Sequence, residues 1–372
     1  MRFINCADFH FMNCHPYSKV NLELNVNERF LLQMKIFRMI CNYAIKNNVK
    51  YILASGDIFE YFNPSSRERT EVFNLLSEYR DRGLIFFIID GNHDTNGFWS
   101  ALGYLGKLKA PDINVVSGEP RYFEELGLAC YPYMPGQTVE SIKREFKDKP
   151  NKNILMLHGA IVNALNWKNT SCRDMFDLSE LFDLGFNYTA IGDLHTNQSW
   201  NNGEQYIAYP GNIMAKDFTE FDSQQKYFMD VEIADGKVNV KKIKLPIVNP
   251  LLKYDFDSEV VDTQFGTKIK FNFADFKNSI VKVIVSKNNP DFRQKQVLDS
   301  IYEKGASFVF AEQRSTTETS ITYSDNTSID SFKIEDVISE FCTQKGYDTE
   351  FPLKIYKDVK EISNREKLRD IE

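Results

Sequence analysis

Residues 84–94 read Leu-Ile-Phe-Phe-Ile-Ile-Asp-Gly-Asn-His-Asp, six apolar residues followed by a turn residue and polar side chains. An unbroken apolar run of this length predicts a strand over Leu84–Ile89 that is buried on both faces, as in a parallel sheet covered by helices. Asn92, His93 and Asp94 come at the carboxyl end of that strand, where sites form in open α/β sheets. This stretch therefore predicts an α/β fold with a functional site at one edge of its sheet.

The same arrangement occurs on both sides of this stretch. Apolar runs end at polar or acidic residues several more times, and amphipathic segments with helical spacing lie between the first runs. The predicted strands are Phe3–Ala7, Tyr51–Ala54, Ile154–Leu157 and Tyr188–Ile191, and the predicted helices are Val26–Asn47 and Ser65–Arg82.

Residues 205–250 have a different pattern, which predicts β-structure that completes a first domain over residues 1–250. Asp235-Gly236 is a hairpin-turn signal between two of its strands. A second α/β unit is expected over residues 251–314. The strands expected in the first domain are Gln205–Tyr209, Lys226–Ile233 and Val238–Leu245, and the second unit is expected to contain strand Val281–Ser286, helix Asp291–Lys304 and strand Ser307–Ala311.

The last part of the chain has the composition of a linker followed by a helical segment. Residues 315–331 contain 10 Ser or Thr among 17 positions, which is typical of a linker. In residues 332–372 four apolar positions at i, i+3, i+4 and i+7 predict one face of a short helix that docks on a partner. These positions are Ile334, Val337, Ile338 and Phe341.

Composition bounds the class of protein. The 372 residues are 42% hydrophobic and 26% charged, which suits a core-forming globular protein. No run approaches the ~18 apolar residues of a membrane span, and no signal-peptide pattern opens the chain. The six cysteines form no CxxC pair, which fits a reducing cytoplasm. A net charge of −7 excludes a histone-like protein but not a nucleic-acid enzyme with a local basic face.

The positions of the histidines predict a metal site. Four of the five histidines, His10, His93, His158 and His195, follow predicted strands, each beside a glycine or an acidic residue. Two metal ions ~3.5–4 Å apart need a bridging carboxylate, with imidazole and oxygen ligands to complete their shells. Such a pair activates water for attack on a phosphoester, and a histidine kept off the metals protonates the leaving oxygen. His15 matches no such motif and is expected in a surface loop.

The motifs D-x-H, G-D, G-N-H-D, H and G-x-x-H, which begin at Asp8 and end at His195, resemble those of the calcineurin-like metallophosphoesterases. Within that superfamily the chain is similar to the SbcD-type nuclease subunits of SbcCD recombination complexes, and its length resembles shorter phage-encoded members. Tyr209-Pro210-Gly211-Asn212 resembles the segment after the last family motif. The resemblance implies an α/β fold built as a helix-flanked β-sandwich, a small DNA-binding α/β capping domain over 251–314 and a C-terminal helical tail.

The resemblance also implies roles for individual residues. His93 would be the general acid, and Asp94 would orient its ring. One metal would be held by Asp8, His10, Asp57 and His195, and the second by Asp57, Asn92, His158 and Asp193. The family usually has histidine at the position of Asp193, and a carboxylate there favours Mn²⁺ or Mg²⁺. The other interpretation of Asp193 is a turn carboxylate that caps the following loop.

Three functions follow as hypotheses. The first is a Mn²⁺-dependent DNA nuclease with two ions, a 3′–5′ exonuclease on duplex ends and an endonuclease on single strands. The resemblance implies a homodimer, an SbcC-type coiled-coil ATPase as partner, a role in recombination and repair, and a cytoplasmic location, in the host if the chain is phage-encoded. The alternatives are a phosphatase of another substrate and a non-catalytic scaffold that binds DNA ends. The chain has no G-x-x-x-x-G-K-[ST] loop, so ATP would be hydrolysed by the partner.

Two further features bear on DNA contact. Residues 241–314 carry 13 Lys or Arg and 9 Asp or Glu, which is compatible with a phosphate-tracking face or with an ordinary solvated surface. Phe59, Tyr61 and Phe62 follow Asp57, where either packing or stacking on an unpaired base can use an aromatic ring. Packing is the expected use.

Overall fold

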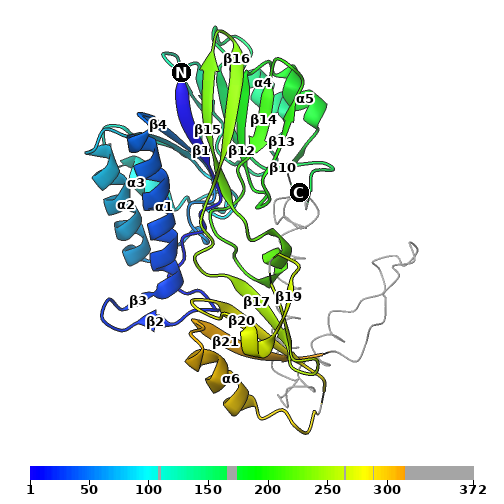
Figure 1. Cartoon of the computed structure of the whole chain (residues 1–372). Helices are drawn as coiled ribbons and strands as arrows, with labels where there is room; N and C mark the ends of the chain where they lie inside the picture. Colours follow the sequence, from blue (N-terminus) through cyan, green and yellow to red (C-terminus); the bar gives the residue numbers. More distant parts are fainter. Residues whose placement is uncertain (108–109, 166–173, 264, 288, 315–372) are drawn as a thin grey trace, which may run out of the picture. The chain divides into compact units, whose positions relative to one another are not determined.

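Two six-stranded β-sheets form the centre of the structure, a computed structural model that describes all residues except 108–109, 166–173, 264, 288 and 315–372 (Figure 1). The first sheet has the order β16-β15-β1-β4-β5-β6 and the second has the order β13-β14-β12-β9-β8-β7. The first contains β1 (Arg2–Cys6), β4 (Tyr51–Ser55), β5 (Ile85–Ile89), β6 (Ile113–Val116), β15 (Tyr227–Ala234) and β16 (Lys237–Lys244). The second contains β7 (Arg121–Phe123), β8 (Leu128–Cys130), β9 (Ile154–His158), β12 (Tyr188–Gly192), β13 (Gln198–Asn201) and β14 (Tyr206–Tyr209).

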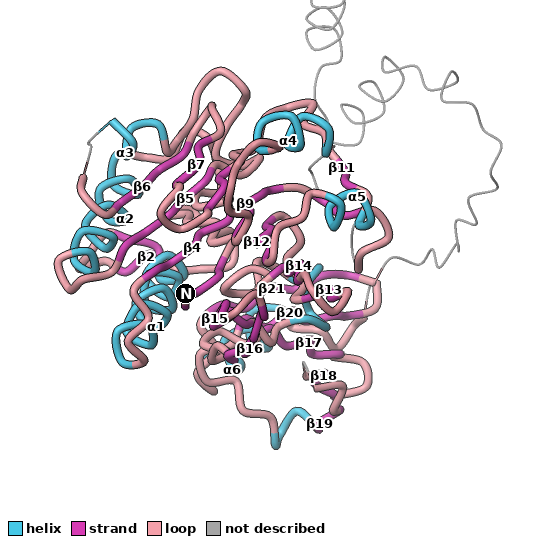
Figure 2. The backbone as a smooth tube through the Cα atoms, turned by 90° about the horizontal axis from the view of Figure 1, so that it is seen from above, coloured by secondary structure: helices cyan, strands magenta, loops and turns pink. Residues whose placement is uncertain are grey.

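Helices cover the outer faces of both sheets. Figure 2 shows α1 (Glu28–Lys46), α2 (Ser66–Arg80) and α3 (Gly103–Lys107) on one side of the sheets, and α4 (Val139–Phe146) and α5 (Leu178–Asp183) on the other. The described residues before 246 therefore form four layers, helices, sheet, sheet and helices. The predicted class, α/β with a helix-flanked β-sandwich, is confirmed.

The side-chain alternation of each strand explains why four layers form. Successive residues of a strand point to opposite faces. Ile4 and Ile52 pack with the helices of the outer face, whereas their neighbours Phe3 and Leu53 pack against the second sheet. Because the residues that face either way are apolar, the central strands β4 and β5 have two buried faces and read as continuous apolar runs.

The two long helices begin and end where their capping residues dictate. The predicted start of α1 at Val26 is wrong by two residues, since Val26 and Asn27 form β3, which pairs with β2 (Val20–Asn21). The Asn27 side chain then accepts the Arg29 N–H and caps the helix. In α2, Ser65 and Glu68 form a complete capping box.

Parallel pairing brings the ends of the central strands together. In the first sheet β1 pairs with β4, and β4 pairs with β5. In the second sheet β9 pairs in parallel with β12, with Gly192 opposite His158. The polar segments that follow these strands therefore leave the same edges, as the sequence predicts.

Residues 251–313 form a separate five-stranded sheet of order β19-β18-β17-β20-β21. Its predicted elements Val281–Ser286, Asp291–Lys304 and Ser307–Ala311 correspond to β20, α6 and β21. Three strands, β17, β18 and β19, were not predicted, because they are short and interrupted by charged residues. The bounds are β17 (Leu251–Asp255), β18 (Val260–Asp262), β19 (Lys268–Lys270), β20 (Ile280–Val285), α6 (Gln294–Glu303) and β21 (Phe308–Gln313).

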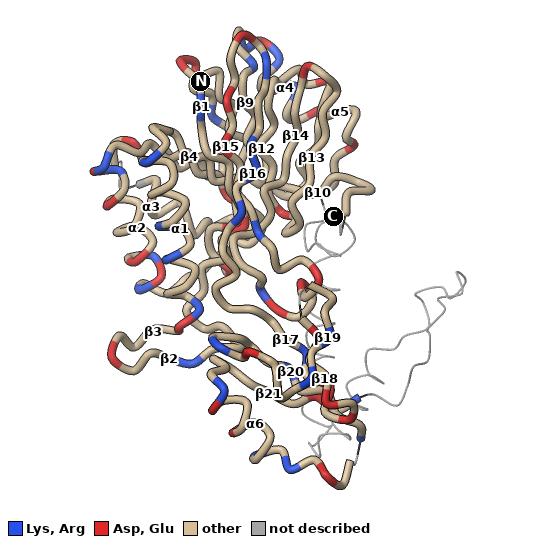
Figure 3. The backbone as a smooth tube through the Cα atoms, in the orientation of Figure 1, with Lys and Arg blue, Asp and Glu red and all other residues tan. Residues whose placement is uncertain are grey.

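This sheet is attached to the preceding residues by specific contacts. The Gln224 side chain accepts the Leu251 N–H at 2.7 Å and donates to the Leu251 carbonyl at 3.0 Å. The ring of Tyr17 stacks on Phe310, with 5.1 Å between centroids. Lys/Arg and Asp/Glu both occur over the unit (Figure 3), and Lys282 and Arg314 form ion pairs with acidic side chains. DNA binding by this unit stays a prediction.

Smaller elements complete the described chain, and some predictions lie outside it. The smaller elements are β10 (Ala160–Ile161), β11 (Met175–Phe176) and the 3₁₀ helices η2 (Phe218–Ser223) and η3 (Phe271–Phe273). The predicted linker and the partner-binding positions Ile334, Val337, Ile338 and Phe341 lie beyond the described residues. Among the described helices, none combines the length and the apolar character that a bilayer crossing requires.

Candidate metal centre

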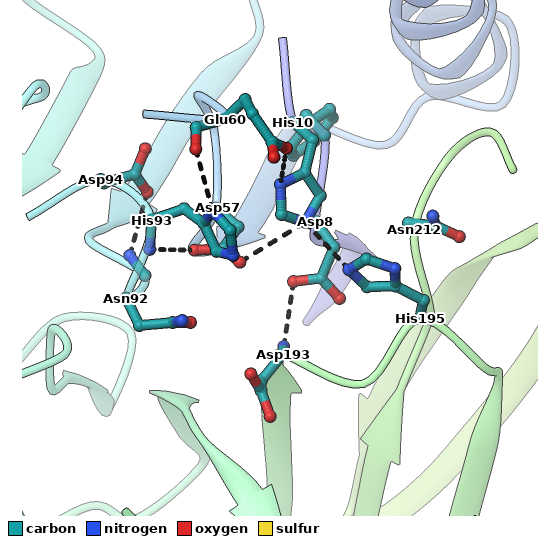
Figure 4. A network of polar contacts seen from close by, with 12 residues as sticks. Asp8, His10, Asp57, Glu60, Asn92, His93, Asp94, Asp193, His195 and Asn212 are labelled. Carbon is teal, nitrogen blue, oxygen red and sulfur yellow. Dashed lines mark hydrogen bonds and ion pairs between the residues drawn. The ribbon is translucent and has the colours of Figure 1, made fainter. Parts of the chain in front are cut away.

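Asp8, His10 and Asp57 reach the centre of the site because their backbones turn sharply at the strand ends. All three have positive φ, at 53°, 47° and 52°, a conformation that non-glycine residues adopt rarely and that recurs at functional sites. Backbone hydrogen bonds hold these turns, from Asp8 N–H to the Gly56 carbonyl at 3.1 Å and from His10 N–H to the Asp57 carbonyl at 3.0 Å. The segments after β1 and β4 are thereby joined beyond their strands, and their side chains converge (Figure 4).

The Asp57 carboxylate lies at the middle of the site. Its Oδ2 is 3.5 Å from His10 Nε2, and its Oδ1 is 3.5 Å from His158 Nε2. Oδ1 also accepts the His93 backbone N–H at 2.9 Å. The carboxylate is buried, and burial by itself would raise its pKa, but the neighbouring imidazoles, His158 first, lower the pKa below its usual value. Asp57 therefore offers one charged oxygen to each of two groups of ligands.

The group around Oδ1 contains His158 and Asn92. His158 Nδ1 lies 2.8 Å from the Ser55 carbonyl, and its Nε2 lies 2.9 Å from Asn92 Oδ1. A carbonyl only accepts, so the His158 proton belongs on Nδ1 and the Nε2 lone pair faces the site. An imidazole lone pair, an amide oxygen and a carboxylate oxygen then meet at one point, which is a cation-binding arrangement.

The group around Oδ2 contains His10 and His195, and a carboxylate lies on the outer side of each ring, as an ion pair for His10 and as a hydrogen bond for His195. His10 Nδ1 lies 2.9 Å from Glu60 Oε2, and His195 Nδ1 lies 2.8 Å from Glu220 Oε1. The two Nε2 atoms lie 2.9 Å apart. Carboxylates that fix the far nitrogen of a metal-binding imidazole are a regular feature of metal sites.

The unsatisfied polar atoms of the site fit a divalent cation. Asp8 Oδ2 is buried without a hydrogen-bond partner, although buried carboxylate oxygens are rarely left unpaired. Burial, followed by the negative charge of Asp57, raises the pKa of Asp8, and burial lowers the pKa of His10. A cation at this point would offset both effects. Asp57 belongs to two groups with metal-ligand spacing, one with His10 and His93 and one with Asp8 and His158.

Asp193 and Asp94 have contacts that the sequence did not indicate. Asp193 donates its backbone N–H to Asp8 Oδ1 at 2.9 Å, and its carboxylate points away from Asp57 in Figure 4. The Asp94 carboxylate accepts the backbone N–H groups of Ile58, Phe59 and Gly91 at 2.8–3.0 Å. Asp94 therefore clamps two loops together.

The ring of His93 has a backbone contact that the sequence did not indicate, since its Nδ1 lies 2.8 Å from the carbonyl of Glu60. Both Asp94 oxygens accept backbone N–H groups. An orienting role of Asp94 for this ring stays a prediction. The ligand roles of the metal residues and the acid role of His93 stay predictions.

Glycine is required where the strand ends crowd together. A Cβ on Gly91 would collide with the Asp57 carboxylate and backbone, and one on Gly56 would collide with His158 Nδ1. Gly56 also has a φ of +89°, which L side chains rarely adopt. These two glycines allow the loops after β4 and β5 to approach within ligand distance.

Sequence reasoning missed the outer residues of the site. Glu60 and Glu220 are buried, and each pairs with a lysine as well as a histidine, Lys216 at 2.6 Å and Lys226 at 2.5 Å. In sequence, Glu60 stands three residues after Asp57, but nothing distinguishes Glu220 from a solvated glutamate. A cleft of about 240 Å³ opens beside His195, lined in part by Lys226 and Lys242.

His15 is not the surface residue that was predicted. The side chain is 4% exposed, and neither ring nitrogen has a hydrogen-bond partner. The Asn27 side chain, next to the start of α1, donates to its carbonyl. Burial lowers the pKa of His15 to about 3, so the ring is neutral and serves as packing.

Comparison with known proteins finds relatives that align with most of this chain. The DNA double-strand break repair protein Mre11 of Archaeoglobus fulgidus is 23% identical over 79% of this chain and 70% of its own length. Mre11 of Methanocaldococcus jannaschii is 24% identical over 100% of this chain and 98% of its own. The metallophosphoesterase YhaO of Bacillus subtilis is 23% identical over 63% of this chain and 58% of its own.

A family model gives the broader assignment. The model of the calcineurin-like phosphoesterases matches residues 1–188, which carry every predicted motif except Asp193 and His195. That range is half of the chain and holds Asp57 together with His10 and His158, one ligand from each group. The chain belongs to the calcineurin-like phosphoesterase family.

Proposed function

We propose that this chain is a metal-dependent DNA nuclease that cleaves phosphodiester bonds with two ions bridged by Asp57. The observation that carries the proposal is the position of the Asp57 carboxylate, with one oxygen 3.5 Å from His10 Nε2 and the other 3.5 Å from His158 Nε2. One ion would be held by Asp8, His10, Asp57 and His195. The other would be held by Asp57, Asn92, His158 and Asp193, with Mn²⁺ or Mg²⁺ favoured by the oxygen ligands.

The side chains divide the work of hydrolysis. Bound metal ions supply Lewis acidity and an activated water. The Glu60 carbonyl accepts from His93 Nδ1–H at 2.8 Å, and this bond sets the direction of the ring. The protonated ring then donates from Nε2 to the leaving oxygen. Asp94 holds this loop against the loop after β4, so the acid and the bridging carboxylate keep a constant separation.

DNA is the proposed substrate because of the relatives and of the unit beyond the family domain. The relative from Methanocaldococcus jannaschii, named for DNA double-strand break repair, aligns with the whole chain, including the unit over 251–314. No described residue of this unit belongs to the metal centre, so a stand-alone phosphatase has no use for it. The proposed activities are 3′–5′ exonuclease on duplex ends and endonuclease on single strands.

An SbcC-type ATPase partner and a homodimer complete the proposal. The partner would bind the apolar face of residues 334–341 and would hydrolyse ATP. Deletion of residues 332–372 is expected to abolish partner binding in a pull-down with the purified ATPase, while basal nuclease activity stays. Retained partner binding would refute this assignment.

The test of the activity uses end-labelled duplex DNA with Mn²⁺, Mg²⁺ or chelator, beside a His93→Ala variant. Cleavage is expected with Mn²⁺ and is expected to fall by about two to four orders of magnitude in the variant, with metal binding intact. A phosphomonoester substrate in parallel separates nuclease from phosphatase. Turnover of the monoester without any DNA cleavage would contradict the proposal.

A further inference from the structure

Two pairs of exposed aromatic side chains follow the metal-binding segments of neighbouring strands. Tyr61 and Phe62, which are 52% and 41% exposed, come just after Glu60 in the segment that follows β4. Phe98 and Trp99, which are 93% and 74% exposed, come just after Asp94 in the segment that follows β5. Large rings usually lie in the core, so four exposed rings on these two segments need an explanation.

The two pairs are held to the same edge of the sheet. β4 and β5 are parallel neighbours, about 4.8 Å apart. The Asp94 carboxylate accepts the N–H groups of Ile58 and Phe59, which joins the segment that carries Tyr61 to the base of the one that carries Phe98. Both pairs therefore leave the edge at which the ligands of the metal centre converge.

The segment that carries Phe98 and Trp99 is a turn that is held by its own hydrogen bonds. Thr95 and Ser100 form a β-bridge. Asn96 Oδ1 accepts the N–H groups of Phe98 and Trp99 at 3.1 and 2.8 Å, and Thr95 Oγ1 donates to the Trp99 carbonyl at 3.0 Å. The base of the turn is fixed by the bond from Ala101 N–H to the Asp94 carbonyl at 2.8 Å. The turn thus fixes the backbone of its tip while it leaves the two rings in solvent.

We propose that Phe98 and Trp99, with Tyr61 and Phe62 beside them, stack on unpaired bases next to the scissile phosphate. This inference rests on the proposed nuclease function and adds the side chains that would hold the unpaired bases of its substrate. Five residues from His93 to Phe98 span at most about 18 Å, so the rings lie within a few nucleotides of the metal centre. Aromatic stacking tolerates any sequence because every base has a π-face.

The area of the four rings favours bases over a second protein chain as the occupant. Aromatic side chains bury 150–250 Å² each when fully covered. Scaled by their exposed fractions, the four rings present about 500 Å². A stable protein interface buries about 800 Å² on each partner, whereas a few stacked bases match the smaller area.

The test measures oligothymidylate binding to the full chain without metal, so that no cleavage occurs. Subtraction of the Trp99→Phe emission spectrum from that of the wild type isolates the fluorescence of Trp99. We expect this fluorescence to be quenched on binding. Phe98→Ser/Trp99→Ser is expected to weaken binding by about 5- to 100-fold per stacked base, Trp99→Leu to weaken it partially, and Trp99→Phe to bind almost as the wild type does. Leu22→Ser, which changes a residue 91% exposed elsewhere, is the matched control and should bind normally.

Two outcomes would overturn the inference. One is normal binding by the double variant together with unquenched Trp99. The other is that the double variant sediments as a monomer where the wild type sediments as a dimer, and that its loss of DNA binding matches its loss of dimer. The rings would then be a contact between copies of the chain. Wild-type hydrolysis of bis(p-nitrophenyl) phosphate with Mn²⁺ tests the metal chemistry separately, so failure of the nuclease proposal is distinguishable from failure of stacking.

Discussion

His10 and His195 face each other across the metal centre, with their Nε2 atoms 2.9 Å apart. A carboxylate lies behind each ring, with His10 Nδ1 2.9 Å from Glu60 Oε2 as an ion pair and His195 Nδ1 hydrogen-bonded to Glu220 Oε1 at 2.8 Å. If each proton lies on the Nδ1 that faces a carboxylate, two lone pairs oppose each other, which is unfavourable unless a cation is between them. The carboxylates behind the rings thus prepare the site for metal.

Glu220→Gln is expected to weaken metal binding while the fold persists. Glu220 accepts from His195, Asn212 and Lys226. Glutamine keeps one acceptor oxygen but loses the charge that fixes the His195 tautomer. Substitutions of this kind typically lower metal affinity 10- to 100-fold, which calorimetric titration with Mn²⁺ measures. Asp222→Asn, an exposed change in the same 3₁₀ helix, should leave affinity unchanged, and equal affinity in both variants would contradict the orienting role.

Asp57→Asn is expected to impair binding of both ions at once. An amide carries no charge and one acceptor oxygen, so it cannot bridge the group around His10 and the group around His158. Loss of several kcal/mol of transition-state stabilisation corresponds to a fall of about 10²- to 10⁴-fold in DNA cleavage. Metal analysis of the dialysed protein gives the stoichiometry, and two ions retained at wild-type affinity would exclude a bridging role.

Asp193→Asn distinguishes a ligand from a turn residue. If Asp193 is a ligand of the second ion, removal of its charge should lower the affinity of the protein for that ion at least about tenfold. The first ion should stay bound. The backbone N–H bond to Asp8 is kept in this variant, so the fold is not at risk. Unchanged affinity for both ions would show that only the backbone of Asp193 serves the site.

Asp94→Ala is expected to destabilise the metal-free protein by at least about 3 kcal/mol. Three buried backbone N–H groups, those of Ile58, Phe59 and Gly91, would lose their acceptor, at a cost of about 1–3 kcal/mol each. Urea unfolding measures the change. Asp148→Ala, at an exposed position, is the control and should change stability by less than about 0.5 kcal/mol.

Asp230 is expected to make stability fall in acid. Burial would raise the pKa of Asp230, but hydrogen bonds from Arg2 and Tyr43 outweigh burial and lower it. A lowered pKa contributes stability that is present above the unfolded value of about 3.9 and is lost as the pH falls through the folded value. Asp230→Asn should therefore cost about 1 kcal/mol at pH 7 and nothing in strong acid.

Thermal unfolding as a function of pH checks this prediction. Asp235→Asn is the matched control, because asparagine suits the hairpin turn before Gly236 equally well. The difference in unfolding temperature between the wild type and Asp230→Asn is compared at neutral and acid pH. An equal difference at both would mean that ionisation of Asp230 does not contribute to stability.

Much of the architecture follows from local sequence patterns. The apolar run Leu84–Ile89 and its counterparts predict the central strands, because a strand that is covered on both faces consists of consecutive apolar residues. Strands β17, β18 and β19 were not predicted, because they are short, contain charged residues and therefore lack a continuous apolar run. The start of α1 moves from Val26 to Glu28 because antiparallel pairing of Val26 with Asn21 outweighs its helical spacing.

The sequence by itself determined the fold class and the residue types of the candidate metal site, because short, local motifs are sufficient to identify strand ends and candidate metal ligands. Only the tertiary structure decided which groups surround those ligands. Glu220 meets His195 from a segment 25 residues away, and the backbone carbonyl of Glu60 lies 2.8 Å from Nδ1 of His93. Such contacts depend on how separate segments pack in three dimensions, and an isolated glutamate or a backbone carbonyl leaves no local pattern from which that packing can be read.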